Sequence, residues 1–414
     1  MKISLCMICR DEEKKIERCI NSIKQVVDEI VVVDTGSIDK TVEIARGLGA
    51  RIFEMIWEDD FSKARNEALE KCQGDWIIFL DADEYFMEES TKELRGLIEK
   101  ADNLKKDLIL SEMLDQGSKG IQAIFKTIRI FRHHESIRYE GRVHEKLYKD
   151  GGELKGIDFS QMLKIYHDGY AEDAVQAKDK IERNIQLLLE EYKTRPLSSD
   201  ICYYLMEAYR GKADWDKAWE FGIKTLGCDT ITLQGIKEET YDSLLDLCRI
   251  IKKESIITEK LYNEALKVSK DFPDFDFRYG CYFYELKEHS KAIEYLEQCM
   301  VKMEHYKGLA MSKAMANVKL VLELLAECYL IKEKNQEAVG TLVKVLRIAP
   351  YEYVALYHLV KLLEIQETGE AIGRFLRNFY SFEKREDQEF LLEVSKNLGN
   401  KDLYEYMLTS KKSE

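Results

Sequence analysis

Two carboxylates, Asp81 and Asp83, stand at the end of an apolar run, DWIIFLDAD over residues 75–83. Side chains two apart on a strand point to the same side, so both carboxylates are expected to converge on one object beyond the sheet edge. Unpaired carboxylates are costly to bury, and a divalent cation would relieve their repulsion. Oxygen ligands favour Mg²⁺ or Mn²⁺, ions that also hold phosphate oxygens. The alternative is a solvated strand end, which accounts for most Asp-x-Asp pairs.

A third acid, Asp34, ends the run EIVVVD and precedes the turn TGSIDKT. A carboxylate at the carboxyl end of a strand, before a glycine-containing turn and a helix, suits hydrogen bonding to a base or a ribose. Thr35, Ser37 or Asp39 could instead cap that helix. We expect Asp34 to contact a ligand and Ser37 and Asp39 to act as caps.

These acids belong to an α/β pattern that covers roughly the first 170 residues, where apolar strand-like runs alternate with amphipathic helical stretches. The runs are 3–9, 29–34, 50–57, 75–83 and 123–131. The segment GLG at 47–49 predicts a helix end. The pattern predicts a mostly parallel, Rossmann-like sheet, whose ligands gather beyond the carboxyl ends of the strands.

From about residue 175 the sequence has helical periodicity without strand signals. Three segments can be superposed, each with an aromatic residue nine positions before an alanine: Tyr209 and Ala218, Phe283 and Ala292, Tyr329 and Ala338. Small residues let paired helices approach closely while aromatics fill the groove between pairs, so the pattern resembles the tetratricopeptide repeat (TPR). The alternative is a plain helical bundle. We predict domains at 1–172 and 173–414, the second a scaffold or a concave binding face.

The composition limits the partners. The 414 residues carry a formal net charge of −14, with 45% hydrophobic and 34% charged residues. This indicates a globular protein and disfavours nucleic acid or an anionic membrane surface as the main partner. No apolar run approaches the ~20 residues of a membrane-spanning helix, and the N-terminus becomes charged too early for a signal peptide. We therefore expect a cytoplasmic protein without stable membrane insertion.

Ten cysteines are scattered along the chain, which suits a reducing compartment. Cys6 and Cys9 form a CxxC within the first strand-like run. Residues three apart on a strand face opposite sides of the sheet, so we expect neither a shared metal nor a redox pair there.

Four segments, ISLCMICRDEEKKIERCINSI, VVVDTGSIDKT, WEDDFSKARNEAL and WIIFLDADE, resemble the family 2 glycosyltransferases with the GT-A fold in order and spacing. The resemblance covers residues 3–84 and implies a UDP-sugar donor bound across the first half of the sheet. The donor-binding residues that it implies are Met7, Ile8, Cys9, Arg10, Glu12, Asp34, Ser37, Arg65, Asp81 and Ala82.

Within this set the resemblance implies that Met7 to Arg10 and Glu12 border the base and that Asp34 binds uracil or ribose. It implies that Arg65 approaches the nucleotide or the diphosphate. Asp81 would contact ribose or metal, and Asp83 would be the firmest ligand of Mg²⁺ or Mn²⁺. Where the family commonly has Asn-Glu after the first strand, this chain has Arg10-Asp11-Glu12-Glu13.

The resemblance also implies inversion at the sugar by direct displacement, with one general base on the acceptor side. In RIFRHHESIRYEGRVHEKLY (129–148) the candidates for this base are Glu145 first and His144 second. Alternatively, Glu140 and Glu145 form surface ion pairs with the nearby basic residues Arg129, Arg132, Arg138, Arg142 and Lys146. His133 and His134 have the pattern of loop residues. His167 in KIYHDGY would return to the metal or diphosphate, or is a structural histidine.

The closer resemblance is to the bacterial peptide S-glycosyltransferases of glycocin biosynthesis, of the sublancin and thurandacin type. WEDDFSKARN, FLDADE, GRVHE and YHDGY, followed by a repeat-like helical tail, carry it. It implies transfer of a hexose, expected to be glucose from UDP-glucose, to a Cys or Ser of a bacteriocin precursor peptide held by the helical tail. Alternatives are a lipopolysaccharide-core glucosyltransferase and a non-catalytic repeat adaptor. A homodimer is also compatible with such helical arrays.

Overall fold

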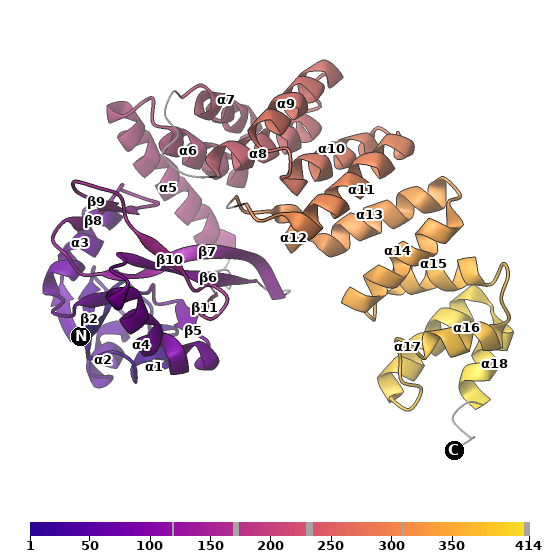
Figure 1. Ribbon diagram of the computed structural model, residues 1–414, viewed down its shortest axis with the longest axis horizontal. Helices are drawn as coiled ribbons and strands as arrows, with labels where there is room; N and C mark the ends of the chain where they lie inside the picture. Colours follow the sequence, from indigo (N-terminus) through magenta and orange to yellow (C-terminus); the bar gives the residue numbers. More distant parts are fainter. Residues whose placement is uncertain (118–119, 169–173, 229–234, 309, 410–414) are drawn as a thin grey trace. The chain divides into compact units, whose positions relative to one another are not determined.

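The computed structural model describes residues 1–117, 120–168, 174–228, 235–308 and 310–409 (Figure 1). The chain divides into two compact units, Met1–Thr240 and Tyr241–Glu414. The first unit holds an α/β part, β1 to β11, followed by helices α5 to α7, and the second unit is helical. The predicted domain boundary between residues 172 and 173 lies outside the described residues, and it stays a prediction.

The first half of the sheet is parallel, with the order β3-β2-β1-β4. These strands are β1 (Ile3–Cys9), β2 (Glu29–Asp34), β3 (Arg51–Glu54) and β4 (Trp76–Phe79). Each lies within a predicted apolar run, because strands covered on both faces need apolar residues throughout. The carboxyl ends of β1, β2 and β4 therefore meet at one edge of the sheet.

The second half of the sheet is mixed, with β4 followed in order by β7, β6, β11 and β5. These strands are β7 (Gly120–Arg132), β6 (Leu108–Gly117), β11 (Lys164–His167) and β5 (Glu84–Phe86), and β10 (Gly156–Asp158) also pairs with β6. A separate hairpin joins β8 (Ile137–Glu140) to β9 (Lys146–Lys149). The predicted run 123–131 lies in β7, whereas β5, β6 and β11 were not predicted. Because β5 begins directly after Asp83, its pairing with β11 brings that residue beside the last strand.

Helices cover both faces of this sheet. On one face α1 (Ile16–Ile23) and α4 (Glu88–Asn103) pack with Cys9, and on the other α3 (Phe61–Lys71) packs with Cys6. The two cysteines of the CxxC thus face opposite sides, as predicted, and all ten cysteines are free. Helix α2 (Thr41–Gly47) ends in the predicted GLG segment, where Gly49 has a φ of +94°.

Three helical hairpins contain the predicted aromatic–alanine pairs: α6 (Ser199–Gly211) with α7 (Trp215–Leu226), α10 (Pro273–Glu285) with α11 (His289–His305), and α13 (Val318–Ile331) with α14 (Asn335–Ile348). All six residues of these pairs are buried. Each hairpin turns at a left-handed residue four positions after the aromatic, namely Ala213, Lys287 and Glu333. The next N–H donates to the carbonyl of the aromatic, at 2.9, 3.0 and 2.9 Å. The same helix end at the same register in each hairpin confirms a TPR-like repeat.

The other helices are α5 (Ala174–Thr194), α8 (Ile236–Ile250), α9 (Ser255–Val268), α12 (Lys313–Ala316), α15 (Tyr353–Leu363), α16 (Gly369–Leu376), α17 (Arg385–Leu398) and α18 (Lys401–Thr409). Within the described ranges, no helix combines the length and the apolar character that a bilayer crossing requires.

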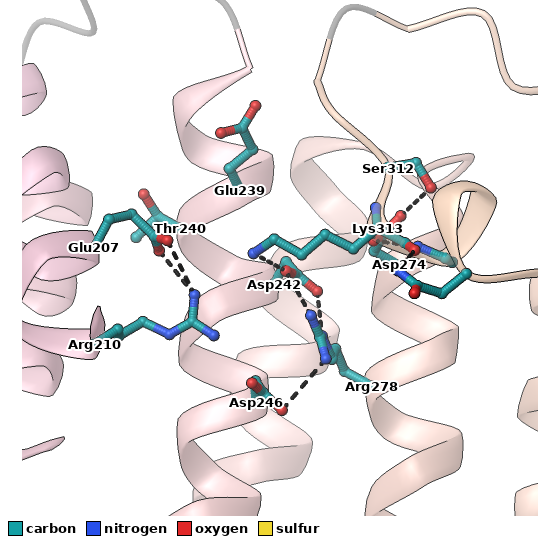
Figure 2. Close-up of polar contacts among 12 residues, drawn as sticks. Glu207, Arg210, Glu239, Thr240, Asp242, Asp246, Asp274, Arg278, Ser312 and Lys313 are labelled. Carbon is teal, nitrogen blue, oxygen red and sulfur yellow. Dashed lines mark hydrogen bonds and ion pairs between the residues drawn. The ribbon is translucent and has the colours of Figure 1, made fainter. Parts of the chain in front are cut away.

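A buried ionic network joins α8, α10 and α12 in the second unit, as Figure 2 shows. The carboxylate of Asp242 lies 2.6 Å from Arg278 Nε and 3.0 Å from Lys313 Nζ. Asp274, which is fully buried, accepts hydrogen bonds from the Ser312 hydroxyl and from the N–H groups of Lys313 (2.6 Å) and Ala314 (3.0 Å). Burial, with the charge of Asp242, raises the pKa of Asp274 to about 7. Asp274 thus fixes the start of α12, although its ionised form is disfavoured by burial and by the charge of Asp242.

The stability of the wild-type protein relative to Asp274→Asn is expected to fall as pH rises from about 4 to about 8. The folded pKa of Asp274 lies above the unfolded value, so its stabilising contribution is complete below the unfolded pKa and is lost through about 7. Thermal unfolding midpoints of both proteins across this range measure the difference. Asp271→Asn, at an exposed neighbouring site, is the control. A wild-type minus Asp274→Asn difference that does not change with pH would contradict this assignment.

Candidate active site

The loops that follow β1 and β2 are joined by hydrogen bonds at the parallel edge. The buried Asp34 carboxylate accepts from the N–H groups of Gly36 (3.0 Å) and Ser37 (2.9 Å) and from the Ser37 hydroxyl. The same hydroxyl accepts from the N–H of Asp11 at 3.0 Å, so Ser37 ties the loops together and its predicted role as a cap is wrong. Asp39 does cap, because it accepts from the N–H of Thr41, the first residue of α2, at 2.9 Å.

The remaining donor-binding candidates of the first strand lie along this edge. The side chains of Met7, Ile8 and Cys9 are buried in the two cores, so only their main chain can face a ligand. Arg10 is exposed, and its Nε lies 3.9 Å from Asp11. The N–H of Glu12 donates to the Thr41 hydroxyl at 2.7 Å, so Glu12 connects the loop after β1 to the start of α2.

Asp81 and Asp83 lie in a turn, because β4 ends at Phe79 and the N–H of Glu84 donates to the Asp81 carbonyl at 3.0 Å. The expectation that both acids continue the strand is therefore wrong, and their side chains have different partners. Asp81 lies 3.0 Å from Arg65 and 3.6 Å from Arg129. Burial acts to raise its pKa, but the two guanidinium groups prevail and lower it to about 2. Ala82, between the two acids, is buried in the core.

Arg65 connects the turn that carries Asp81 to the segment that carries Glu145. Its guanidinium, 7% exposed, binds Asp81 through Nη2 and the Glu145 carboxylate through Nε. It also lies 4.5 Å from the ring centre of Phe79 and 5.5 Å from that of Tyr139. Glu145 is accordingly a largely buried partner of Arg65, and the alternative of a surface ion pair with the neighbouring basic residues is wrong.

A second buried ion pair supports this arrangement. Arg129 of β7 makes two hydrogen bonds to Glu84, Nε–Oε2 at 2.7 Å and Nη2–Oε1 at 2.6 Å. Glu84 also accepts from the N–H of Asp81 at 3.2 Å, so it fixes the turn that carries the two acids. Glu84 and Arg129 were not among the predicted site residues. A possible signal was Glu84, an acid at the start of the apolar segment EYF, because a carboxylate that is buried there needs a cationic partner.

Asp83 faces His167 on β11. Its Oδ2 lies 3.5 Å from His167 Nε2 and 3.8 Å from Lys15 Nζ, while His167 Nδ1 lies 2.9 Å from Asp115 Oδ1. The hydrogen bond with Asp83 raises the pKa of His167 to about 9. Asp115 lies on β6, a strand that was not predicted, so this residue was not among the predicted site residues.

The donor chemistry at this point fits a divalent cation. Asp83 supplies oxygen and His167 supplies nitrogen, and a bound cation would replace Lys15 and the ring hydrogen of His167 as the charge partner of Asp83. Asp168, whose N–H donates to the Asp83 carbonyl at 3.1 Å, has one carboxylate oxygen, Oδ1, that is buried without a hydrogen-bond partner among the described residues. In the same ranges no group of three His, Cys, Asp or Glu side chains is already gathered in a metal-binding geometry.

A cavity of about 340 Å³ lies between the 140–148 segment and helices α5 and α6. His144 lines it, stacked on Tyr204 of α6 with ring centres 4.0 Å apart. Lys146 Nζ also reaches α6, 2.6 Å from Asp200. Val143, Leu147, Leu188 and Ile201 provide the apolar part of the lining. Glu145 lies between the lining residues His144 and Lys146 in the sequence, but its own side chain binds Arg65.

His133 and His134 are loop residues, as predicted. His133 Nδ1 lies 2.9 Å from the Gly74 carbonyl and His134 Nδ1 lies 2.8 Å from the Ser136 hydroxyl. Neither contact involves the acids at the sheet edge.

Comparison with known sequences finds a family that matches the residues of this edge. Residues 4–149 match the family Glycosyl transferase family 2. The predicted fold class, an α/β GT-A domain followed by TPR-like helices, is thereby confirmed. The matched residues include Asp34, Arg65, Asp81, Asp83 and Glu145.

Two relatives cover part of the chain. A TPR repeat-containing protein of Synechococcus elongatus is 34% identical over 49% of this chain and 50% of its own length. The SPbeta prophage-derived glycosyltransferase SunS of Bacillus subtilis is 31% identical over 47% of this chain and 46% of its own length. The chain thus spans about half the length of these relatives.

Two solved structures align over limited regions. Glucosyl-3-phosphoglycerate synthase of Mycobacterium tuberculosis, in complex with Mn²⁺, UDP and glucosyl-3-phosphoglycerate, is 25% identical with a TM-score of 0.24, over 28% of this chain and 45% of its own. Pseudomonas aeruginosa PilF is 16% identical with a TM-score of 0.34, over 52% and 91%. We therefore base the function on the sequence match and on the geometry of the site.

Arg65→Met is expected to lower the free energy of unfolding of the protein by about 3–5 kcal/mol, because it leaves the buried Glu145 without its cation and Asp81 with Arg129 alone. Urea denaturation followed by tryptophan fluorescence measures this. The loss should be smaller when Glu145→Gln is already present, since one of the two charges is then absent. Arg51→Met, which removes an exposed pair with Glu29, should cost less than about 1 kcal/mol. Equal losses for the two arginine variants would contradict the bridging role of Arg65.

Proposed function

We propose that this chain is a metal-dependent UDP-sugar glycosyltransferase that transfers a hexose, glucose from UDP-glucose, to a Cys or Ser side chain of a bacteriocin precursor peptide. Glycosyltransferase activity follows from the family 2 match. The observation that carries the proposal is the linked arrangement at the parallel edge, where Arg65 joins Asp81 to Glu145 and where Asp83 faces His167.

On the donor side, the main chain after β1 and the loop held by Asp34 would border the nucleotide. Arg65 and Arg129 keep Asp81 ionised and in place, so that it can accept from a ribose hydroxyl or bind a metal. Asp83 and His167 would hold Mg²⁺ or Mn²⁺, which when bound neutralises charge on the leaving diphosphate.

On the acceptor side, Glu145 is the proposed general base. Arg65 fixes the orientation of its carboxylate, and the acceptor thiol or hydroxyl would give its proton to Glu145 as its sulfur or oxygen bonds to the sugar C1. The bond from C1 to the UDP oxygen breaks in the same displacement, which inverts the sugar carbon. A thiol, with an ordinary pKa near ~8.5, needs less help from a base than a hydroxyl does. His144, stacked on Tyr204, is better placed to line the route of the acceptor than to act as the base.

The acceptor assignment rests on the relationship to SunS and on the cavity between the 140–148 segment and helices α5 and α6. Its size is at the lower end of ligand pockets, and its apolar lining with paired charges suits one or two side chains of a peptide. We further propose a cytoplasmic location, because such a precursor would be modified before export. A homodimer through the helical repeats stays a prediction.

Asp83→Ala is expected to lower the rate of sugar transfer at least about 100-fold, because it removes the carboxylate that would hold the metal. Mass spectrometry of a Cys-containing acceptor peptide incubated with UDP-glucose measures transfer, and circular dichroism checks the fold. Asp158→Asn, in an exposed pair with Lys126, is the control and should retain activity. Full activity of the wild-type protein in EDTA would be evidence against the metal.

Tyr204→Ala is expected to raise the KM for the acceptor peptide about tenfold, since it removes one wall of the cavity, and to leave UDP-glucose hydrolysis without acceptor unchanged. Release of UDP with and without peptide separates the two effects. Tyr203→Phe, on the same helix but outside the cavity lining, is the matched control. An unchanged peptide KM in Tyr204→Ala would place the acceptor elsewhere.

A further inference from the structure

The imidazole of His167 lies between two carboxylates that come from different strands of the sheet. Asp115 Oδ1 is 2.9 Å from Nδ1, and Asp83 Oδ2 is 3.5 Å from Nε2. Asp115 and His167 are direct partners in the parallel pairing of β6 with β11. His167 is also the partner of Glu84 in the pairing of β11 with β5, next to Asp83. Backbone pairing on both sides of His167 therefore fixes all three side chains relative to one another.

This placement distinguishes the two ring nitrogens. A carboxylate can only accept hydrogen bonds, so Nδ1 donates its hydrogen to Asp115, and the ring directs Nε2 toward Asp83 at the longer distance of 3.5 Å. A metal ion bound by Asp83 would take the place of the hydrogen on Nε2, while Nδ1 keeps its hydrogen bond to Asp115. Histidine ligands of metals commonly donate their other N–H to a carboxylate in this way, which fixes the tautomer and the orientation of the ring. Asp115 is 12% exposed at its side chain and has His167 as its hydrogen-bond partner, as expected for a carboxylate that serves the imidazole.

We propose that Asp115 is a positioning residue that holds His167 as a nitrogen ligand of the cation bound by Asp83. This rests on the proposed function, since it concerns the cation of that same site. First-row transition ions such as Mn²⁺ accept imidazole nitrogen, so Mn²⁺ is a suitable probe of this ligand.

Mn²⁺ titration of the full-length protein without nucleotide, followed by the EPR signal of free Mn²⁺, tests this proposal. Asp115→Asn is expected to weaken Mn²⁺ binding about 10- to 100-fold, the usual effect of removing a partner of a metal-binding histidine. Asp115→Glu, which keeps the carboxylate, should bind more tightly than Asp115→Asn. Glu112→Gln removes a carboxylate from the same strand, where it pairs with Lys164 at 3.5 Å, and should bind as the wild type does.

The double variant separates positioning from simple loss of negative charge. If Asp115 acts through the imidazole, Asp115→Asn adds nothing to the effect of His167→Ala, whereas a general charge effect would add to it. Pulsed EPR of the bound Mn²⁺ should show nitrogen coupling from the imidazole in the wild type and not in His167→Ala.

Two results would overturn the inference: unchanged Mn²⁺ affinity in Asp115→Asn, or additive effects in the double variant. Failure of the wild type to bind Mn²⁺ would instead remove the metal from the proposed function. The two failures are therefore distinguishable.

Discussion

Buried carboxylates must have cationic partners, and this constraint organises the active-site edge. The acids that the fold gathers there are Asp81, Asp83, Glu84, Asp115 and Glu145, and none of them is more than one-third exposed at the side chain. Each is balanced by a cation from another element, since removal of a charge from water is repaid only by close and well-oriented partners. Arg65, Arg129 and His167 therefore decide where the acids point.

The cationic partners of these acids come from three different elements around the sheet. Arg65 comes from α3, Arg129 from β7 and His167 from β11, so the turn after β4 is held from three directions. A site built on paired strands and a packed helix is held more precisely than one on loops alone. The loops after β1 and β2 are fixed differently, by the hydrogen bonds of Asp34 to its own turn, which leave their main chain at the edge where ligands of parallel sheets bind.

The first helices after the α/β part line the cavity beside the 140–148 segment. Asp200 and Tyr204 of α6 contact Lys146 and His144, and the N–H of Arg142 donates to Glu191 of α5 at 3.3 Å. These contacts explain why α5 to α7 fall in the same compact unit as the sheet. The later hairpins repeat one helix end with different residues at the left-handed position, so the turn is specified by packing of the aromatic–alanine pair.

The sequence by itself determined the parallel strands, because apolar runs buried on both faces leave a continuous local pattern, and it determined the repeat, because each aromatic–alanine pair lies within one hairpin. It also pointed to Asp34, Asp81 and Asp83 at the carboxyl ends of strands, and the family resemblance pointed to Arg65 and Glu145. Only the tertiary structure decided which charge meets which. The pairs Arg65–Glu145 and Asp115–His167 join residues 80 and 52 positions apart, and no local periodicity reports a contact between elements that are not neighbours in the chain. The turn after Phe79 was likewise decided by Glu84 and its pairing with Arg129, because a buried ion pair outweighs the tendency of the strand to continue.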